Sequence, residues 1–361
     1  MMTPHRLRWD HRQRDVLSYA LVFTVPLSVL IGDRLGGWGL LLTPLLVFGM
    51  VPLLDGIIGI DIANPPPDAS REDDRRSYRT LTWLCAPCQM ALVIWGAWAV
   101  GRPDTGVFEF LGLAVAVGVS SGILGINVSH ELQHRIDSNL ETFLSRAMLL
   151  TVGYMHWAIE HVAGHHRHVA TPRDPATARL GESVYRFLPR SIFGGFRSAW
   201  GIERERLRRR GQRQVSLHNR VLRYLLMELA AMGMLAAVFG GTALAYWLVQ
   251  SLVAIVLLEV VNYVEHYGLQ RRHQGDRYEP VRVWHSWNAS HWLTNRFLFN
   301  LQRHSDHHYR PGRRYQDLRH HAASPQLPAG YAGMIVLAMI PSLWRRVMDK
   351  RVLRALRMPV N

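Results

Sequence analysis

Six long apolar stretches limit this chain to a helical fold embedded in a membrane. A helix that crosses a bilayer needs about 20 mostly apolar residues, and its backbone polar groups must be hydrogen-bonded within the helix because lipid offers them no partners. The stretches that meet this length lie at residues 16–32, 38–60, 80–100, 107–128, 221–240 and 243–264. The sequence therefore predicts an all-α integral membrane protein with about six transmembrane helices.

The connections between these stretches predict which side of the membrane carries the rest of the chain. Short turns around Gly36, Pro103 and Gly240 join the stretches into three hairpins, so all the long connections fall on the opposite side. Those connections are rich in arginine, as in ERERLRRRGQRQ (203–214) and RRVMDKRVLRALR (345–357). Because basic loops stay in the cytoplasm, we expect a multi-pass protein of the bacterial cytoplasmic membrane with both termini inside.

The cytoplasmic segments 129–220 and 265–361 are long enough to form a helical cap on the bundle, so we expect one domain, 1–361. Within the cap, the shorter apolar stretches 143–159 and 331–344 predict helices that are buried or lie on the membrane surface. The N-terminus is long, polar and basic before the first apolar stretch, so we expect no cleavable signal peptide.

Net charge and cysteine content exclude two other classes of protein. The charge of +15 fits basic cytoplasmic loops better than nucleic-acid binding, since no recognition motif accompanies it. Cys85 and Cys88 are the only cysteines, so a disulfide framework is excluded. One C-x-x-C pair supplies half of a four-thiolate metal site, and we expect both residues to be buried in the third span.

Nine histidines lie in four short clusters, each beside a carboxylate. Neutral imidazole binds iron, copper, nickel or zinc well, and spacings of three to five residues place rings on one face of a helix or on its next turn. The clusters are HELQH with His130 and His134, EHVAGHH with His161, His165 and His166, NYVEHYGL with His266, and LQRHSDHH with His304, His307 and His308. His130 and His266 each follow the end of a predicted span by two residues, so we expect all four clusters to converge at the cytoplasmic mouth of the bundle.

Nine imidazoles exceed the coordination shell of one transition metal and indicate a pair of metals. Soluble di-iron bundles use mainly carboxylate ligands, whereas the candidate ligands here are almost all nitrogen. Glu131, Glu160, Glu265 and Asp306 lie within or beside the clusters. Because ligand histidines usually donate their second ring N–H to a carboxylate, we expect these acids to orient the ligand rings, with at most one of them reaching a metal.

Two alternatives of a different class use the same residues. HELQH matches H-E-x-x-H, the signature of zinc metalloproteases, with Glu131 as the general base. That interpretation leaves most of the clustered histidines without a role. A metal transporter or metal-handling protein would line a path through the spans with its ligands, yet every cluster here lies on one side of the bilayer.

Together these segments resemble the membrane-bound alkane 1-monooxygenases, which are relatives of the integral-membrane fatty acid desaturases and the xylene monooxygenases. The resemblance runs from PLLDGIIGIDIANPP to LPAGYAGMIVLAMIPSLWRRVMD, and NYVEHYGL and LQRHSDHH are close to diagnostic of the alkane branch. HSWN (285–288) and ATPRDPATARLGES, which starts at Ala170, also match. Arg135 departs from the family, which usually has lysine there, but it keeps the positive charge.

The resemblance implies a non-haem di-iron enzyme whose two irons are held by the nine clustered histidines, with no catalytic side chain beyond the metal centre. It implies that O2 and a medium- to long-chain n-alkane react at the terminal methyl to give a 1-alcohol. It also implies an apolar channel whose depth is limited by a residue of the second span, and the matching residue is the small Val47. A fatty-acid or xylene-type methyl hydroxylase is the main alternative.

Electrons must come from outside, because the chain carries no flavin or nicotinamide fingerprint and no rubredoxin-type pair of C-x-x-C motifs. The resemblance implies a separate rubredoxin with its reductase. Such carriers are usually acidic, so either the basic run 204–213 or the basic tail would dock them by charge, unless these arginines contact lipid headgroups.

The other ten histidines are not expected to bind metal. His156 is expected to be a hydrogen-bonded core residue, while His168, His285 and His291 are expected near the site. Six more are expected at the surface: His5, His11, His218, His273, His320 and His321.

Overall fold

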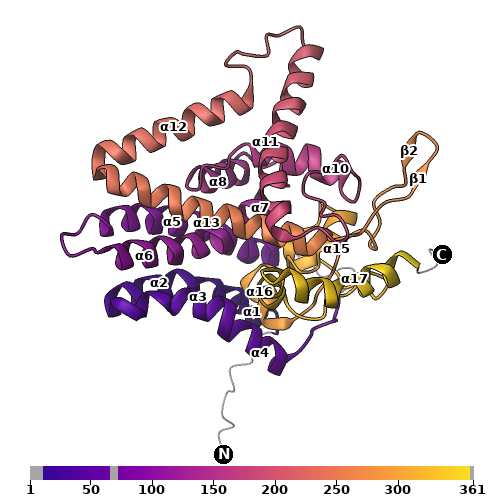
Figure 1. Ribbon diagram of the computed structural model, residues 1–361, viewed down its shortest axis with the longest axis horizontal. Helices are drawn as coiled ribbons and strands as arrows, with labels where there is room; N and C mark the ends of the chain where they lie inside the picture. The colour runs from indigo at the N-terminus through magenta and orange to yellow at the C-terminus, as the bar shows by residue number, and fades with distance from the viewer. Residues whose placement is uncertain (1–10, 66–71, 358–361) are drawn as a thin grey trace, which may run out of the picture.

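The computed structural model describes residues 11–65 and 72–357, and helices make up most of it. Six helical segments are long and apolar enough to cross a membrane: Asp15–Leu35, Gly37–Ile58, Arg76–Ala99, Val107–Gln133, Arg220–Phe239 and Gly241–His266. They lie side by side as a bundle that runs horizontally in Figure 1. The helical fold and the six spans predicted from the sequence are confirmed.

Some spans are single helices and others are runs of shorter helical pieces. The first is formed by α1 (His11–Tyr19), η1 (Ala20–Phe23) and α2 (Thr24–Leu35), and the second by η2 (Gly37–Leu41), α3 (Leu42–Leu45), η3 (Leu46–Met50) and α4 (Val51–Ile58). The third is α5 (Glu72–Ala99), and the fourth joins α6 (Val107–Ser120), η4 (Ser121–Ile126) and α7 (Asn127–Gln133). The last two are α12 (Arg220–Phe239) and α13 (Gly241–His266).

Glycines end two of the hairpin helices where the sequence predicted turns. Gly36 follows α2 with φ +66°, and Gly240 follows α12 with φ +86°. A residue with positive φ at a helix end satisfies the last carbonyls, and glycine adopts that conformation without steric cost. Each turn therefore sends the chain directly back into the bundle.

Two spans extend further than the sequence predicted. The fourth continues through α7 to Gln133 and the sixth continues to His266, so both helices carry candidate ligands within their own last turns. Hydropathy marks only the lipid-facing part of a helix, because the polar residues that follow are buried against the cap rather than in lipid.

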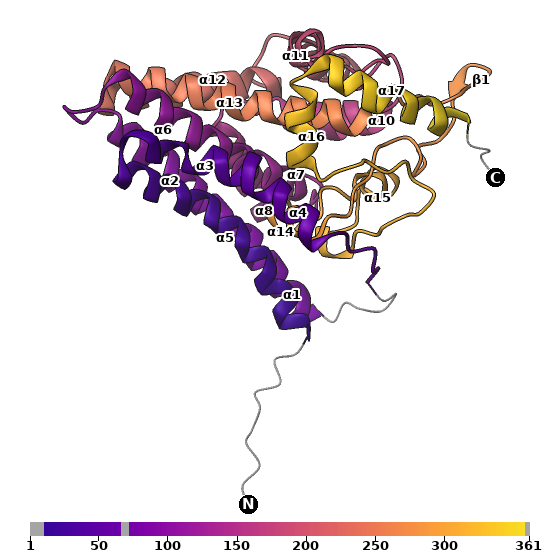
Figure 2. The ribbon, with the colours of Figure 1, turned by 60° about the horizontal axis from the view of Figure 1, so that its bottom comes forward.

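The cap covers one end of the bundle, as Figure 2 shows from a second direction. Its first part contains α8 (Asn139–Leu150), α9 (Trp157–Glu160), η5 (His161–His165), α10 (His166–His168) and α11 (Val184–Arg209). Its second part contains the hairpin β1 (His273–Gln274) and β2 (Arg277–Tyr278), then α14 (Trp292–Phe297), α15 (His304–Tyr309), η6 (Tyr315–Asp317), α16 (Tyr331–Ala338) and α17 (Pro341–Arg357). The apolar stretch 143–159 is divided between α8 and α9, and 331–344 between α16 and α17.

Buried acids attach the cap to the bundle. Asp55, near the end of the second span, accepts hydrogen bonds from the backbone N–H of Thr294 at 3.1 Å and from its hydroxyl at 2.5 Å. Glu203 of α11 pairs with Arg206 and with Arg220 at the start of α12. α11 crosses the end of the bundle and stands nearly upright in Figure 1. These contacts fix the cap segments over the ends of the spans.

Candidate metal centre

The nine histidines predicted as ligands come together in two adjacent groups. In each group, one ring nitrogen per residue lies within 4.8 Å of all the others. The first group has five members and the second has four: His130, His134, His161, His166 and His307, then His165, His266, His304 and His308. The sequence placed all nine at one end of the bundle, but it did not predict how they divide.

A π-helical turn places the histidines of EHVAGHH in two different groups. In an α-helix, side chains five residues apart point about 140° away from each other. The turn η5 instead has the wider π geometry, in which residues five apart are in register. It therefore brings Nε2 of His161 to 3.0 Å from Nε2 of His166. His165, one position earlier than His166, turns to the other group, where its Nε2 lies 3.2 Å from that of His308.

The short helix α15 bridges the two groups. His304 and His308 are four residues apart and face the second group, while His307 faces the first. Nε2 of His307 lies 3.1 Å from Nε2 of His166, and Nε2 of His304 lies 3.1 Å from Nε2 of His266. One helical turn thus supplies ligands to both sites, so the two metals would be neighbours.

The spacing of these nitrogens fits metal ions. Ligand nitrogens at about 2.1 Å from an ion lie about 3.0 Å apart when they subtend a right angle, and the closest Nε2 pairs here are 3.0 to 3.2 Å apart. Neutral imidazole presents a lone pair at Nε2 when the proton is on Nδ1. Two such lone pairs facing each other repel, and a cation between them removes the repulsion.

Burial keeps most of these rings in the neutral form that binds metal. It lowers the pKa of His161 and of His307 well below the usual histidine value, and neighbouring histidines lower both further. Burial, together with the adjacent Arg135, lowers the pKa of His134 to about 3. Proton competition at these three rings is therefore weak at neutral pH.

Asp174 orients one ligand, and the sequence analysis did not single it out. Its carboxylate lies 2.9 Å from Nδ1 of His165, which leaves Nε2 of that ring free for the second group. Burial opposes the charge on His165, but Asp174 outweighs it and raises the pKa of His165 to about 9. The sequence analysis noted the segment that begins at Ala170 as a match to the family. Asp174 is the one aspartate in that segment, and this could have identified it as a candidate partner of a ligand.

Two of the four acids expected to orient ligand rings have other partners. Glu131 accepts a hydrogen bond from Arg135 at 2.5 Å. Asp306 accepts from Arg313 at 2.6 and 2.8 Å and lies 2.7 Å from Nε2 of His321. The prediction that Glu131 and Asp306 orient ligand rings rested on their closeness to ligands in the sequence. It was wrong because side chains adjacent on a helix point in different directions.

The other two acids, Glu265 and Glu160, lie close to the histidine groups. Oε2 of Glu265 lies 3.2 Å from Nε2 of His304, the nitrogen that faces the second group. Glu160 is buried beside η5 without a hydrogen bond to a ligand ring among the described residues, and burial followed by Asp174 raises the pKa of Glu160 to about 8.

An apolar cavity leads from the two histidine groups into the bundle. At the cap end its walls include His130, His161, His304 and Glu265. Deeper walls come from the second, fourth and sixth spans: Val47, Phe48, Gly122, Ile123, Leu257 and Val261. Trp157 also lines it, with its ring 4.6 Å from that of His161. Val47 is buried, and the structure places it on this wall.

π-helical turns surround this cavity. η3 contributes Val47 and Phe48, η4 contributes Gly122 and Ile123, and η5 contributes His161. An inserted residue widens a helix and redirects its side chains, and such turns are frequent at functional sites. A hydropathy pattern does not distinguish a π-helical turn from an α-helical one, so the sequence analysis did not predict these turns.

Comparisons with known proteins agree with the resemblance seen in the sequence. The fatty acid desaturase family matches residues 107–338. The chain is 43% identical to alkane 1-monooxygenase of Pseudomonas putida over 320 residues, which cover 88% of this chain and 79% of that protein. It is 45% identical over 312 residues to alkane 1-monooxygenase 2 of Pseudomonas aeruginosa, covering 85% of this chain and 82% of that one. The chain belongs to the alkane 1-monooxygenase family.

The relationship extends more weakly to another branch of the superfamily. The hydroxylase component XylM of xylene/toluene monooxygenase from Pseudomonas putida is 30% identical over 346 residues, 94% of this chain and 89% of that protein. The desaturase match spans α6 to α16 and so contains all nine histidines. Val47 lies outside the segment matched by the desaturase family.

Arg135, the one departure from the family pattern noted above, has a structural role. Its guanidinium donates to Glu131, to the carbonyl of Gly312 at 2.7 Å and to the carbonyl of Arg313 at 2.7 Å. A planar fork with several fixed donors makes these contacts better than the single ammonium group of lysine. It ties HELQH to the loop after α15.

None of the remaining described histidines belongs to either histidine group. His156 is buried between Tyr154 and Phe196, although its Nε2 has no partner in the described part of the chain. His320 and His321 were expected at the surface, but both are half-buried: His320 lies against Ser290 and His321 against Asp306. Of the others, His285 is buried and lies 3.1 Å from Glu279, His168 and His291 are half-buried, and His218 and His273 are exposed. His5 is outside the described residues, and the side chain of His11 in α1 is not described.

Proposed function

We propose that this chain is a non-haem di-iron monooxygenase that hydroxylates the terminal methyl of medium- to long-chain n-alkanes to 1-alcohols. The overall reaction consumes one alkane, one O2, two electrons and two protons and yields the 1-alcohol and water. One iron would be held by the five-histidine group and one by the four-histidine group. The whole chain, 1–361, would act as one membrane domain.

The observation that carries this proposal is the apolar cavity that ends at both histidine groups. An n-alkane has no polar handle, so shape alone must decide which carbon meets the metals. A narrow passage between spans admits a chain end first, and the substrate already partitions into the bilayer that surrounds the passage. Regiochemistry at the terminal methyl then follows from the geometry of the walls.

The residues of the site hold the metals and exclude water. When bound, the iron pair supplies the activation of O2, which no side chain can perform. Asp174 holds the proton on Nδ1 of His165 and so directs Nε2 to the metal. Trp157 lines the cavity with its ring 4.6 Å from that of His161 and would keep the reacting end of the alkane in apolar surroundings.

The relatives favour the alkane branch over the xylene-type alternative. Identity to two alkane 1-monooxygenases is 43% and 45%, compared with 30% to XylM. The zinc protease alternative is disfavoured by Glu131, since a carboxylate paired with a buried arginine is poorly placed to act as a general base. A transporter is disfavoured because both histidine groups lie at one end of the bundle.

The electron donor and the orientation belong to the same proposal. Two electrons must enter for each turnover, and we propose a separate rubredoxin with its reductase as their source. The cap would face the cytoplasm of a bacterium, where such carriers are reduced, and the spans would lie in the inner membrane. Arginine-rich segments in the cap support this orientation.

Metal analysis combined with product analysis tests the proposal. Purified protein supplied with reduced rubredoxin and O2 is expected to convert octane and hexadecane to 1-alcohols and to contain about two irons per chain. One zinc per chain with peptide hydrolysis would support the protease instead. Bound metal without any oxidised product would support a metal-handling protein.

A further inference from the structure

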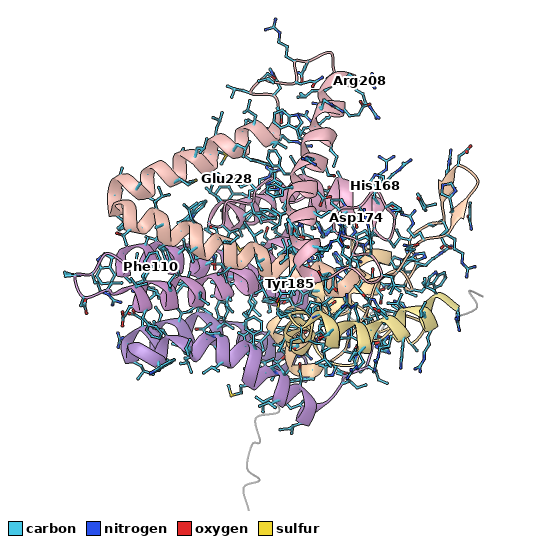
Figure 3. All side chains as sticks on the ribbon, in the orientation of Figure 1. Phe110, His168, Asp174, Tyr185, Arg208 and Glu228 are labelled. Carbon is cyan, nitrogen blue, oxygen red and sulfur yellow. The ribbon has the colours of Figure 1, made fainter. Side chains whose placement is uncertain are left out.

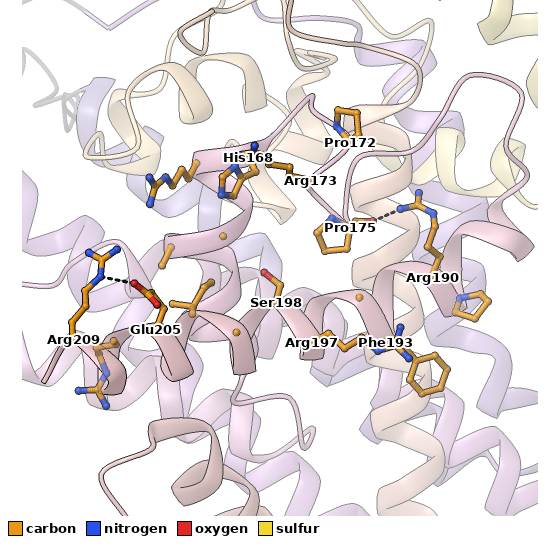
Figure 4. Close-up of a pocket in the computed structure, with 18 of the residues that line it drawn as sticks. His168, Pro172, Arg173, Pro175, Arg190, Phe193, Arg197, Ser198, Glu205 and Arg209 are labelled. Atoms are coloured by element: carbon orange, nitrogen blue, oxygen red, sulfur yellow. Dashed lines mark hydrogen bonds and ion pairs between the residues drawn. The ribbon is translucent and has the colours of Figure 1, made fainter. Parts of the chain in front are cut away.

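A basic cleft lies between α11 and the segment from η5 to Arg179 (Figure 4). Eight arginines line it, and Glu205 is the single carboxylate among its lining residues. His168 and Asp174, which mark this region, lie on the side of α11 away from Phe110 at the far end of the bundle (Figure 3). The cleft therefore opens at the cap and not between the spans.

Part of this positive charge has no ion-pair partner among the described residues. Arg190, Arg206 and Arg209 form ion pairs with nearby carboxylates. Arg167 and Arg197 are exposed, and neither forms an ion pair among the residues that the structure describes. A concave surface lined by one sign of charge concentrates the field and attracts a partner of the opposite sign.

The cleft also carries an apolar anchor. Phe193 of α11 is 66% exposed and lies beside Arg197 in Figure 4. An exposed aromatic ring among arginines is typical of the centre of a protein–protein interface, where both residue types are enriched.

The floor of the cleft is the backbone that carries metal ligands. Ala163 and Gly164 line it and belong to η5, between His161 and His165. A Cβ on Gly164 would lie 2.7 Å from Oε1 of Glu160 and 2.9 Å from Oγ of Ser198, so only glycine lets α11 pack this closely on η5. A partner in the cleft would be separated from two ligand histidines by a single layer of backbone.

We propose that this cleft is the docking site of an acidic electron-carrier protein, through which electrons reach the histidines of η5. The inference rests on the function proposed above. Of the two basic segments that the sequence offered for docking, the run 204–213 contributes to this cleft, whereas α17 contributes none of its lining residues. Positive charge, an exposed aromatic ring and contact with the turn η5 coincide in this cleft.

Charge reversal in the cleft tests the proposal against a matched control. Arg167→Glu with Arg197→Glu changes the cleft, and Arg346→Glu with Arg354→Glu makes the same charge change at exposed positions of α17. Both variants and the wild type are placed in nanodiscs and assayed with reduced rubredoxin and octane. The cleft variant is expected to raise KM for rubredoxin about tenfold and to flatten its dependence on ionic strength, with KM for octane unchanged. The control is expected to match the wild type.

Three results would overturn the docking site. The cleft variant could keep the wild-type KM for rubredoxin, or the α17 variant could lose affinity in its place. The cleft variant could also lose only a dependence on anionic lipid, when phosphatidylcholine discs are compared with discs containing phosphatidylglycerol, which would make the cleft a headgroup site. Dithionite-reduced methyl viologen needs no docking, so a wild type that makes no 1-octanol with this mediator would refute the proposed function and not the cleft.

Discussion

Replacing Val47 by tryptophan is expected to shorten the alkanes that the enzyme accepts. Val47 lines the cavity together with Gly122 and Leu257, and Leu257 lies eight residues before Glu265 in the α-helix α13. At a helical rise of 1.5 Å per residue, this part of the cavity wall is about 12 Å deeper than Glu265, which lies beside the ligand His304. An extended alkyl chain advances about 1.25 Å per carbon, so about ten carbons fit above Val47.

The magnitude follows from the length that tryptophan closes off. Octane fits above Val47, whereas hexadecane must place about six methylenes beyond it. Each methylene that can no longer be buried in the cavity loses about 0.8 kcal/mol of binding free energy, so the loss for hexadecane approaches about 5 kcal/mol. Because the tail can find a second path towards lipid, we expect a smaller change, of about 100-fold, in the ratio of kcat/KM for hexadecane to that for octane.

Competitive oxidation of an octane and hexadecane mixture by purified protein measures this ratio directly. Leu53→Trp is the matched control, since Leu53 is in the same span but is 71% exposed on the outside of the bundle. Iron content and thermal stability show whether each variant is intact. An unchanged hexadecane-to-octane ratio in an intact Val47→Trp enzyme would refute the assignment of this cavity as the substrate channel.

Three further predictions concern acids of the cap and the site. Asp174→Asn should weaken iron binding about 10- to 100-fold in a chelator competition, and unchanged affinity would deny Asp174 its role in orienting a ligand. Glu265→Gln should alter the Mössbauer signal of one iron and leave the other as in the wild type; two unaltered signals would remove Glu265 from the metal environment. Burial opposes ionisation of Glu203, but hydrogen bonds from Arg206 and Arg220 outweigh it and lower its pKa from 4.5 to about 2. The stability that this acid contributes is thus present above pH 4.5 and lost as the pH falls towards 2, so Glu203→Gln should lower Tm at pH 7 and much less at pH 3.

The sequence predicted the spans and the ligand set for clear physical reasons. Hydrophobic length reports what lipid requires of a helix, and the turns at Gly36 and Gly240 fixed the hairpins. Nine histidines at helical spacing beside span ends could converge at only one end of the bundle. The structure brings all nine together there, and the relatives support the same family.

The sequence did not predict how the site is divided or oriented. The π-helical turn at His161–His165 changes the register by one residue, and this change sends His165 and His166 to different groups. The partner of His165 is Asp174, which is not part of any histidine cluster, whereas Asp306 lies inside one and binds elsewhere. Such choices depend on side-chain direction in three dimensions, which spacing along a chain does not encode.

The most direct test of the account counts iron in purified protein. The wild type should contain about two irons per chain, and His307→Ala should contain about one and form no 1-alcohol, because it removes a ligand of the five-histidine group. His273→Ala, in the exposed β1–β2 hairpin, should match the wild type in both measurements. A His307→Ala protein that keeps two irons and oxidises octane at the wild-type rate would contradict the central claim that this group holds a catalytic metal.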